Sequence, residues 1–196
     1  AGESNKPLGP LVTPGSQPYH AFQNYCSSGY REINTALRKL AGGAERSKIN
    51  PGVLQHIDEL ARVMAQDGAA HDFRATLWRS VNRRTGGHYV SSVKNLKAGD
   101  VHIEHGLGST TARRGFAENW SSGGERPDLW EIDAPTGWRG VAVNEHDLSP
   151  HRSENEILLP AGTEMKILSI ETVEINGKKW RHIRARIVVK EQQPNV

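Results

Sequence analysis

The chain lacks several features that would place it in a specialised class of protein. Its 196 residues include one cysteine, Cys26, so an internal disulfide is impossible, and a fold without such bridges suits a reducing compartment. No stretch approaches the ~18 consecutive apolar residues of a membrane-spanning helix. The N-terminus shows no charged start followed by an apolar core, so no signal peptide is recognisable. We therefore expect no contact with a membrane.

Positive charge is present but thinly spread. The formal net charge is +3, and the basic residues are scattered or occur in pairs such as Arg83-Arg84, Arg113-Arg114 and Lys178-Lys179. A nucleic-acid-binding protein usually concentrates such charge on one face. Nucleic acid is therefore not an expected partner.

Signatures of other enzyme classes are missing too. The sequence contains neither a Gly-x-Ser-x-Gly elbow nor a phosphate-binding P-loop. Among the nine histidines, His102 and His105 are three apart on an expected strand, so they face opposite sides and make a poor metal pair. We expect no bound metal.

Helical patterns occupy the first third of the chain. Residues 1–18 are rich in proline and glycine and predict a flexible leader. Residues 19–40 predict one or two helices. Asn50-Pro51 predicts the capped start of a further helix, whose apolar residues keep a helical period up to Gly68.

Strand patterns dominate from Arg74 onward. Strands are expected near residues 75–81, 100–105, 129–133, 139–143, 155–159, 164–173 and 179–189. Asn176-Gly177 between the last two suits the type I′ turn of a hairpin. Helices first and strands later predict an α+β fold, and the length suits a single domain over residues 19–196.

The most informative stretch runs from Ser153 to Thr163. Ile157, Leu158 and Leu159 predict a short buried strand, with Glu154 and Glu156 at its start. Residues i and i+2 of a strand point to the same face, so both carboxylates are expected to project together. Two such acids repel each other unless a cation or a cationic substrate lies between them. For an isolated Glu-x-Glu, an acidic strand start in solvent would be the simpler interpretation.

Two further elements precede this acidic one. Arg79 lies inside the β-rich segment 75–81; an arginine in a strand is rarely buried without an anionic partner, and its guanidinium suits phosphate. The hydroxyl run Ser109-Thr110-Thr111 follows two glycines, and a short helix is expected from about residue 112.

In this order the elements resemble those of the arginine-specific mono-ADP-ribosyltransferases, a family of toxins and ecto-enzymes defined by Arg, Ser-Thr-Ser and Glu-x-Glu. Arg79, the run from Ser109 to Thr111, and Glu154 with Glu156 would be the three elements. Tyr30 to Arg38 resembles the family's early Tyr-x-x-Ile-Asn-x-x-Leu-Arg helix. The resemblance covers about residues 19–190. It implies N-terminal helices packed on a two-sheet β core of the ADP-ribosyltransferase type.

The resemblance also implies roles for the acids. Glu156 would face the ribose of the substrate NAD and stabilise the positive charge of the transition state. Glu154 would orient the guanidinium of a protein arginine and help to remove its proton. Ser109 would hold Glu156 in its productive rotamer.

Other positions would bind NAD itself. Arg79 would contact the pyrophosphate or the ribose, and Ser109, Thr110 and Thr111 would line the same site, with Thr110 mainly structural. An aromatic residue is expected against the nicotinamide. Its candidates are Phe116, Trp120 and Trp130, and packing in the core is the competing role for Phe116.

Three functions stay open at this point. The chain could transfer ADP-ribose to arginine, mainly hydrolyse NAD, or act as a catalytically silent binding module of the same fold. The intact Glu-x-Glu favours activity. Thr111 in place of the family's usual serine, and the segment 121–138, which matches no family motif, keep the silent module open.

The expected setting follows from the same resemblance. A transferase of this kind with a flexible leader resembles effectors and toxins that bacteria secrete, including by type III secretion, into host cells. The expected partner is a host protein carrying a target arginine in the host cytoplasm. We expect the enzyme to act as a monomer.

Overall fold

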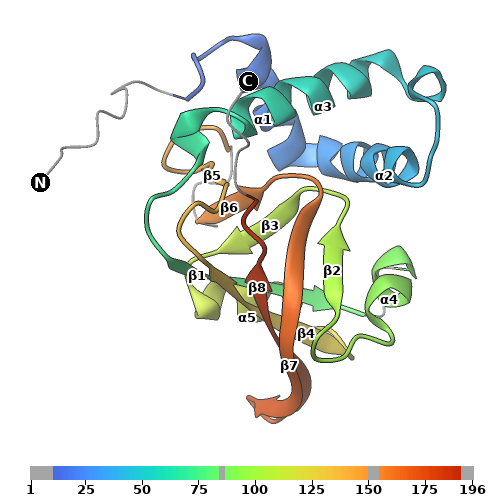
Figure 1. Ribbon diagram of the computed structural model, residues 1–196, viewed down its shortest axis with the longest axis vertical. Helices are drawn as coiled ribbons and strands as arrows, with labels where there is room; N and C mark the ends of the chain where they lie inside the picture. The colour runs from blue at the N-terminus through green and yellow to red at the C-terminus, as the bar shows by residue number, and fades with distance from the viewer. Residues whose placement is uncertain (1–10, 84–86, 150–154, 191–196) are drawn as a thin grey trace, which may run out of the picture. The chain divides into compact units, whose positions relative to one another are not determined.

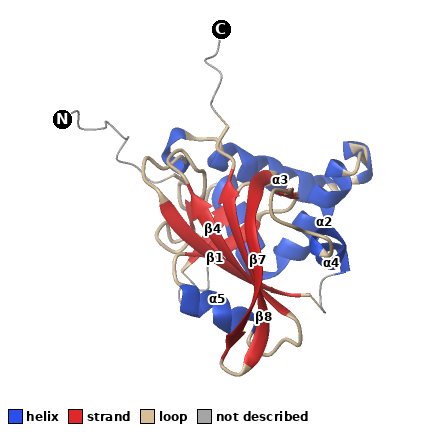
Figure 2. Ribbon diagram, turned by 60° about the horizontal axis from the view of Figure 1, so that its bottom comes forward, coloured by secondary structure: helices blue, strands red, loops and turns tan. Residues whose placement is uncertain are grey.

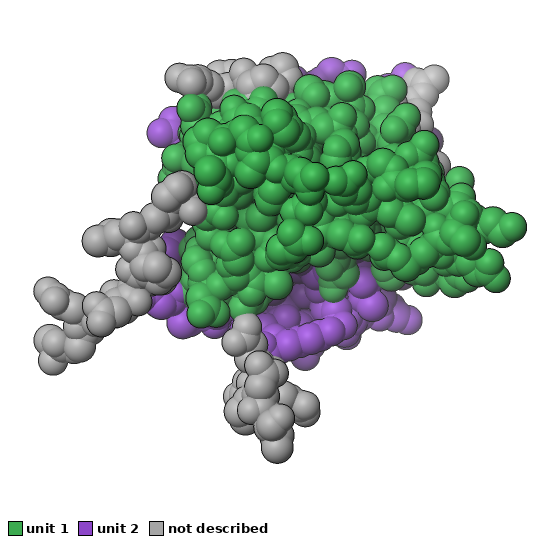
Figure 3. Space-filling view, turned by 90° about the horizontal axis from the view of Figure 1, so that it is seen from above, with its two compact units in different colours: residues 1–71, 105–108, 139–162 green, residues 72–104, 109–138, 163–196 purple. Residues whose placement is uncertain are grey.

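The computed structural model describes residues 11–83, 87–149 and 155–190. The chain folds into two compact units, coloured separately in Figure 3. Unit 1 comprises residues 1–71, 105–108 and 139–162, and unit 2 comprises residues 72–104, 109–138 and 163–196. Each unit is therefore assembled from three separate stretches of sequence.

Unit 1 contains the N-terminal helices (Figure 1). Their bounds are α1 (Gln17–Asn24), the π-helical turn η1 (Tyr25–Gly29), α2 (Tyr30–Ala41), the 3₁₀ turns η2 (Arg46–Lys48) and η3 (Asp67–Ala69), and α3 (Pro51–Met64). Helix α3 packs against both α1 and α2. The side-chain oxygen of Asn50 accepts from the backbone N–H of Gly52 at 2.8 Å and of Val53 at 3.3 Å. The predicted capped start of this helix is confirmed.

One apolar core holds unit 1 together. Phe22, Ile33 and Leu60 bury the inward faces of the three helices. Strands β5 (Val141–Ala142) and β6 (Glu156–Leu159) pair antiparallel, and Val141 and Leu158 from this pair join the same core. Burial of each side chain of this size stabilises the fold by roughly 1.5–3 kcal/mol, so hydrophobic burial fastens the helices to the strand pair.

The described part of the predicted leader differs from the expectation. Val12 is buried, with Leu11 packed beside it in the core of unit 1. Ser16 caps α1, whose first turn contains Pro18. Proline is well tolerated in a first helical turn, because the N–H it lacks would have no intrahelical partner there. Residues 11–18 therefore belong to the folded unit, and residues 1–10 lie outside the described part.

Unit 2 is built on a mixed sheet. Its strands are β1 (Ala75–Asn82), β2 (Val101–Glu104), β3 (Gly108–Thr111), β4 (Pro127–Ala134), β7 (Thr163–Ile175) and β8 (Lys178–Ile187); Gly108 itself is counted with unit 1. They are ordered β2-β7-β8-β4-β1-β3. The pair β4–β8 is parallel and the other pairs are antiparallel.

Two helices belong to unit 2, α4 (Gly87–Val93) and α5 (Arg114–Ser121). Helix α5 packs against β1 and β4 (Figure 2). Ala117 of α5 meets Leu129 and Trp180 in a small apolar cluster. Ser80 adds a hydrogen bond from its hydroxyl to the backbone carbonyl of Ala117. Ser80 therefore ties β1 to α5.

The α+β class is confirmed, with helices first and strands later. The β7–β8 hairpin also matches its prediction, because Asn176 and Gly177 both adopt positive φ, as a type I′ turn requires. Helix α4 and strand β3 were not expected. Four-residue β3 consists of glycine and hydroxyl residues and carries no apolar alternation. In the described part of the chain, no helix has both the length and the apolar character that crossing a membrane requires.

Candidate active site

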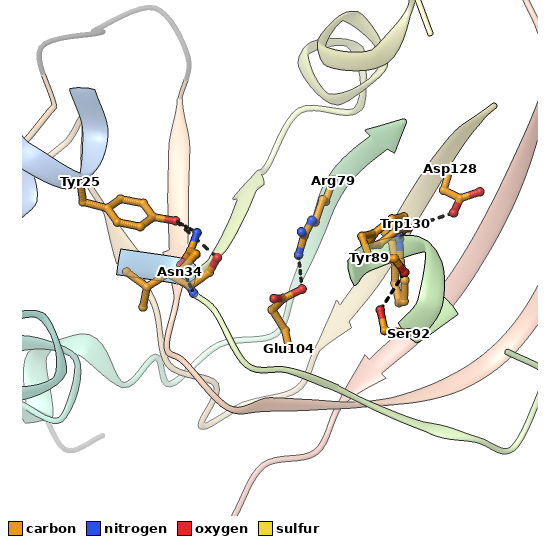
Figure 4. Close-up of polar contacts among 9 residues, drawn as sticks. Tyr25, Asn34, Arg79, Tyr89, Ser92, Glu104, Asp128 and Trp130 are labelled. Atoms are coloured by element: carbon orange, nitrogen blue, oxygen red, sulfur yellow. Dashed lines mark hydrogen bonds and ion pairs between the residues drawn. The ribbon is translucent and has the colours of Figure 1, made fainter. Parts of the chain in front are cut away.

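Arg79 projects from β1 of unit 2 and has an acidic partner. Its Nη1 donates to Oε2 of Glu104 at 3.0 Å (Figure 4). The side chains are 20% and 11% exposed, respectively. The expectation that an arginine in this strand needs an anion is confirmed, and the anion within the protein is a carboxylate at the end of β2. No local pattern in the sequence indicates Glu104 as this partner, because 25 residues separate the pair.

Two aromatic side chains lie on the same face of the sheet as this ion pair. His102 and Glu104 are both buried and alternate with exposed residues along β2, so they point to the same face. The ring of His102 lies 5.3 Å from that of Trp130, and Trp130 is the β4 partner of Arg79 in the strand register. Arg79 therefore lies in a largely buried polar and aromatic environment, where Coulombic interactions are stronger than in water.

A buried hydrogen-bond network extends from Trp130. The indole N–H donates to the hydroxyl of Tyr89 at 2.8 Å, and that hydroxyl donates to Asp128 at 2.9 Å (Figure 4). Burial raises the pKa of Tyr89 far above its ordinary value, and the nearby charge of Asp128 raises it further. Tyr89 therefore stays protonated and acts as a fixed donor. The network docks α4 on β4.

Asp128 is fully buried and is neutralised by arginine. Arg181 binds it through Nε–Oδ1 at 2.9 Å and Nη2–Oδ2 at 2.7 Å. Arg83 Nε lies 3.1 Å from Oδ1, although no hydrogen bond forms there. Burial lowers the pKa of Arg181, but hydrogen bonding and the charge of Asp128 outweigh it, so the pKa is raised overall. The cluster is an ionic anchor for the sheet.

The three residues of the hydroxyl run on β3 differ in burial. Ser109 is partly exposed, whereas Thr110 and Thr111 are fully buried. Thr111 Oγ1 accepts from the backbone N–H of Arg113 at 3.2 Å, which fixes the turn before α5. The hydroxyl at position 111 therefore makes a local bond to the backbone, and threonine makes it as well as the family's usual serine would.

Glu156 begins β6 in unit 1 and is partly exposed, with its carbonyl accepting from Val143 N–H at 3.1 Å. Asn155 before it has φ of 45°, in the left-handed region. The extended geometry on which the shared face of Glu154 and Glu156 was predicted therefore stops at Glu156. That prediction assumed a strand through residue 155, and this assumption was wrong. Glu154 lies outside the described residues.

The chain before Ser109 is held by the family-like helix α2. Asn34 Oδ1 accepts from Leu107 N–H at 2.9 Å, Asn34 Nδ2 donates to Tyr25 Oη at 3.1 Å, and Tyr25 Oη donates to Leu107 O at 3.4 Å. These bonds form a closed ring within unit 1. A Cβ at Gly106 would lie 2.8 Å from Asn34 Oδ1, so glycine is needed for the close approach.

Strand β6 touches the same loop. A Cβ at Gly108 would lie 3.3 Å from Cβ of Leu159, a tight contact within unit 1. The family-like helix, the loop entering the hydroxyl run and the strand of Glu156 are thus packed together. The predicted helix motif contained Asn34, but its bonds to Leu107 could be seen only in the folded chain.

The three aromatic candidates for the contact with nicotinamide differ in burial. Trp130 is 2% exposed and Trp120 is 36% exposed. Phe116 on α5 is partly buried, with the guanidinium of Arg113 5.7 Å from its ring centroid. Phe116 is therefore not fully buried, as the competing role of core packing would require. Over the described ranges, no group of three or more His, Cys, Asp or Glu side chains could hold a metal ion.

Comparisons with known proteins agree with this architecture. The profile of the ADP-ribosyltransferase exoenzyme family matches residues 13–190. The epidermal cell differentiation inhibitor of Staphylococcus aureus is 30% identical over 101 residues, which make up 52% of this chain and 38% of that protein. The chain thus matches well under half the length of this curated relative.

Solved structures show the same fold. Plx2a, an ADP-ribosyltransferase toxin from Paenibacillus larvae, superposes with a TM-score of 0.70 at 19% identity, covering 88% of this chain and 86% of the other. C3stau2 from S. aureus, solved with NAD, gives 0.68 at 18% identity, covering 89% and 87%. The family profile spans nearly the whole chain and includes every residue of the three elements. The chain belongs to the ADP-ribosyltransferase exoenzyme family.

Proposed function

We propose that this protein transfers ADP-ribose from NAD to an arginine side chain of a host protein. The observation that carries the proposal is the family match over residues 13–190, which contains Arg79, Ser109, Glu154 and Glu156 in the family's order. NAD as the substrate is supported by C3stau2, a relative of the same fold that was solved with NAD.

Glu156 is the proposed catalytic acid. Breaking the bond between nicotinamide and ribose passes through an oxocarbenium-like transition state, and carboxylates stabilise such charge in glycoside hydrolysis. Glu156 is partly exposed at the start of β6, so its side chain is not buried in the core. Ser109, also partly exposed, is proposed to support it.

Arg79 is the proposed anchor for the pyrophosphate. A guanidinium binds two anionic oxygens through its planar fork, and Glu104 engages Nη1 at 3.0 Å. The carboxylate restricts the side chain before NAD arrives, and such preorganisation lowers the entropy lost on binding. Thr110 and Thr111 are buried on β3, which pairs with β1, and are proposed to shape the NAD site. Phe116 of α5 is the proposed aromatic ring against the nicotinamide.

Glu154 is proposed to select arginine as the acceptor. Arginine is protonated at any physiological pH, so a carboxylate is needed to orient the guanidinium and to assist loss of its proton. Glu154 itself lies outside the described residues, and its role is proposed from its place in the Glu-x-Glu element.

The test uses purified protein with NAD labelled in its ADP-ribose part and agmatine, a small guanidine, as acceptor. Glu156→Gln should lower both nicotinamide release and label transfer on the order of 100- to 1000-fold, because it removes charge with little change in volume. Glu154→Gln should lose transfer to agmatine yet keep NAD hydrolysis. Glu174→Gln, an exposed acid of β7, is the matched control and should change neither.

The outcomes separate the competing functions. Nicotinamide release without transfer to any guanidine would identify an NAD glycohydrolase, and no release at all would identify a silent binding module. Full activity in Glu156→Gln would remove this residue from the mechanism. The bacterial relatives, one of them a toxin, support secretion from a bacterium. We further propose that the enzyme acts as a monomer in a host cytoplasm.

A further inference from the structure

A groove on unit 1 lies outside the proposed catalytic machinery. It has a volume of about 370 Å³ and is lined by residues of α2 and of the chain from Lys48 at the end of η2 to Val53 in α3. Helices α2 and α3 run side by side in Figure 1 and are in contact. None of the residues assigned to catalysis or to NAD lines this groove.

The floor of the groove is aliphatic and firmly supported. Ala36 and Ile49 are 5% and 9% exposed and belong to the core of unit 1, and Val53 packs against that core. The floor is therefore a fixed apolar surface. It offers neither an aromatic face for stacking a base nor a buried polar side chain for reading one.

The rim of the groove is cationic. Arg31, Lys39 and Lys48 are exposed on it, and Glu32 is the one acid in the lining. Neither lysine forms an ion pair with another described residue. Arg31 is oriented by Tyr30, whose hydroxyl accepts from Nε at 3.1 Å and whose ring centroid lies 5.7 Å from Cζ. The three cations are thus available to an acidic partner.

We propose that this groove docks an acidic segment of the protein that is ADP-ribosylated, with one apolar side chain inserted between flanking carboxylates. The volume lies within the range of pockets that enclose small ligands. A few side chains buried in desolvated pockets supply most of the energy of a typical interface, and the apolar anchor would be one of them. Complementary charge on the rim supplies specificity and faster association. The inference rests on the proposed transferase function and adds how its protein substrate is held.

Docking can be separated from chemistry by comparing two acceptors. Agmatine needs the catalytic residues but no docking surface, whereas proteins in a eukaryotic cell lysate need both. The variant carries Arg31→Glu, Lys39→Glu and Lys48→Glu. The control carries Lys94→Glu, Lys97→Glu and Lys179→Glu, three exposed residues of unit 2, and changes the net charge by the same amount.

We expect the groove variant to label lysate proteins at least ~10-fold less, the size of a loss of about 1.4 kcal/mol in binding, and to modify agmatine at the parental rate. The control should match the parent with both acceptors. Thr35→Trp fills the groove without changing charge, because Thr35 lines it and is exposed. This second variant should show the same selective loss.

Equal labelling of lysate proteins by the parent and both groove variants would overturn the docking site. Loss of labelling in the control as well would assign the effect to net charge and also overturn it. Loss of agmatine modification in the groove variants would place the groove in the chemistry rather than in docking. A parent that modifies neither acceptor would overturn the transferase function itself, which is a distinct result.

Discussion

Two aspartates of β4 make the same kind of contact in opposite surroundings. Asp128 and Asp133 each lie between two arginines, Arg181 and Arg83 for the first and Arg74 and Arg186 for the second. The side chain of Asp128 is fully buried, and its arginines are 14% and 32% exposed. The side chain of Asp133 is 18% exposed, and its arginines are 67% and 50% exposed. Burial, more than the number of ion pairs, decides how much each aspartate contributes to the free energy of unfolding.

The difference follows from solvation. A buried carboxylate has lost its water, so removing its charge leaves its arginines without compensation in a low dielectric. An exposed pair exchanges hydration for attraction at nearly equal free energy. We therefore expect Asp128 to hold the sheet beside Arg79 in place and Asp133 to be dispensable.

Asp128→Asn should have the largest effect. It keeps the size of the side chain but leaves Arg181 and Arg83 facing a neutral amide, so we expect a loss of about 3–5 kcal/mol in the free energy of unfolding. Urea unfolding monitored by tryptophan fluorescence would measure it. A loss no larger than that of Asp133→Asn would remove the distinction between the two aspartates.

Tyr89→Phe should have the next largest effect. The variant keeps the ring but removes the hydroxyl that accepts from Trp130 and donates to Asp128, leaving an indole N–H unsatisfied. We expect a loss of about 1–3 kcal/mol, measured in the same urea titration. Parental stability in this variant would mean that the buried network does not hold α4.

Asp133→Asn should cost no more than about 1 kcal/mol, as exposed pairs do. The hydrogen bond from Arg74 lowers the pKa of Asp133, despite some desolvation, and Arg186 adds to the effect. Because the pKa of Asp133 is lower in the folded state, its ion pairs stabilise the protein at pH values above the unfolded pKa of 3.8. This stabilisation is lost as the pH falls through the folded pKa. The parent and the variant should therefore converge in acid. Thermal unfolding at pH 7 and pH 3 would show whether they do.

His182 should produce the smallest effect, confined to one pH range. Burial lowers its pKa below 6.5, and the charge of Glu131, 3.5 Å away, opposes this only in part. Between the folded pKa and 6.5 the unfolded chain binds more protons, so stability falls as the pH drops through that range. His182→Gln should flatten this part of the stability curve. An unchanged slope in the variant would contradict the assignment.

The main elements could be predicted because they depend on local patterns. Asn50-Pro51 starts α3 through its own capping bonds, and Asn176-Gly177 closes the hairpin through positive φ alone. Helix α4 was missed because it is stabilised by Tyr89 reaching Asp128 and Trp130, residues about 40 positions away. The left-handed Asn155 was missed because the alternation around Glu154 and Glu156 suited an uninterrupted strand equally well.

By itself, the sequence determined the α+β class and the order of the three elements, which depend on local patterns and on spacing along the chain. The resemblance to the family then implied which residues would serve NAD. Only the tertiary structure decided that Arg79 is paired with Glu104, that Asn34 closes a ring of hydrogen bonds on Leu107, and that Asp128 is buried. Each of these joins residues from distant segments. Their energies depend on burial and on contact distance, which no local pattern encodes.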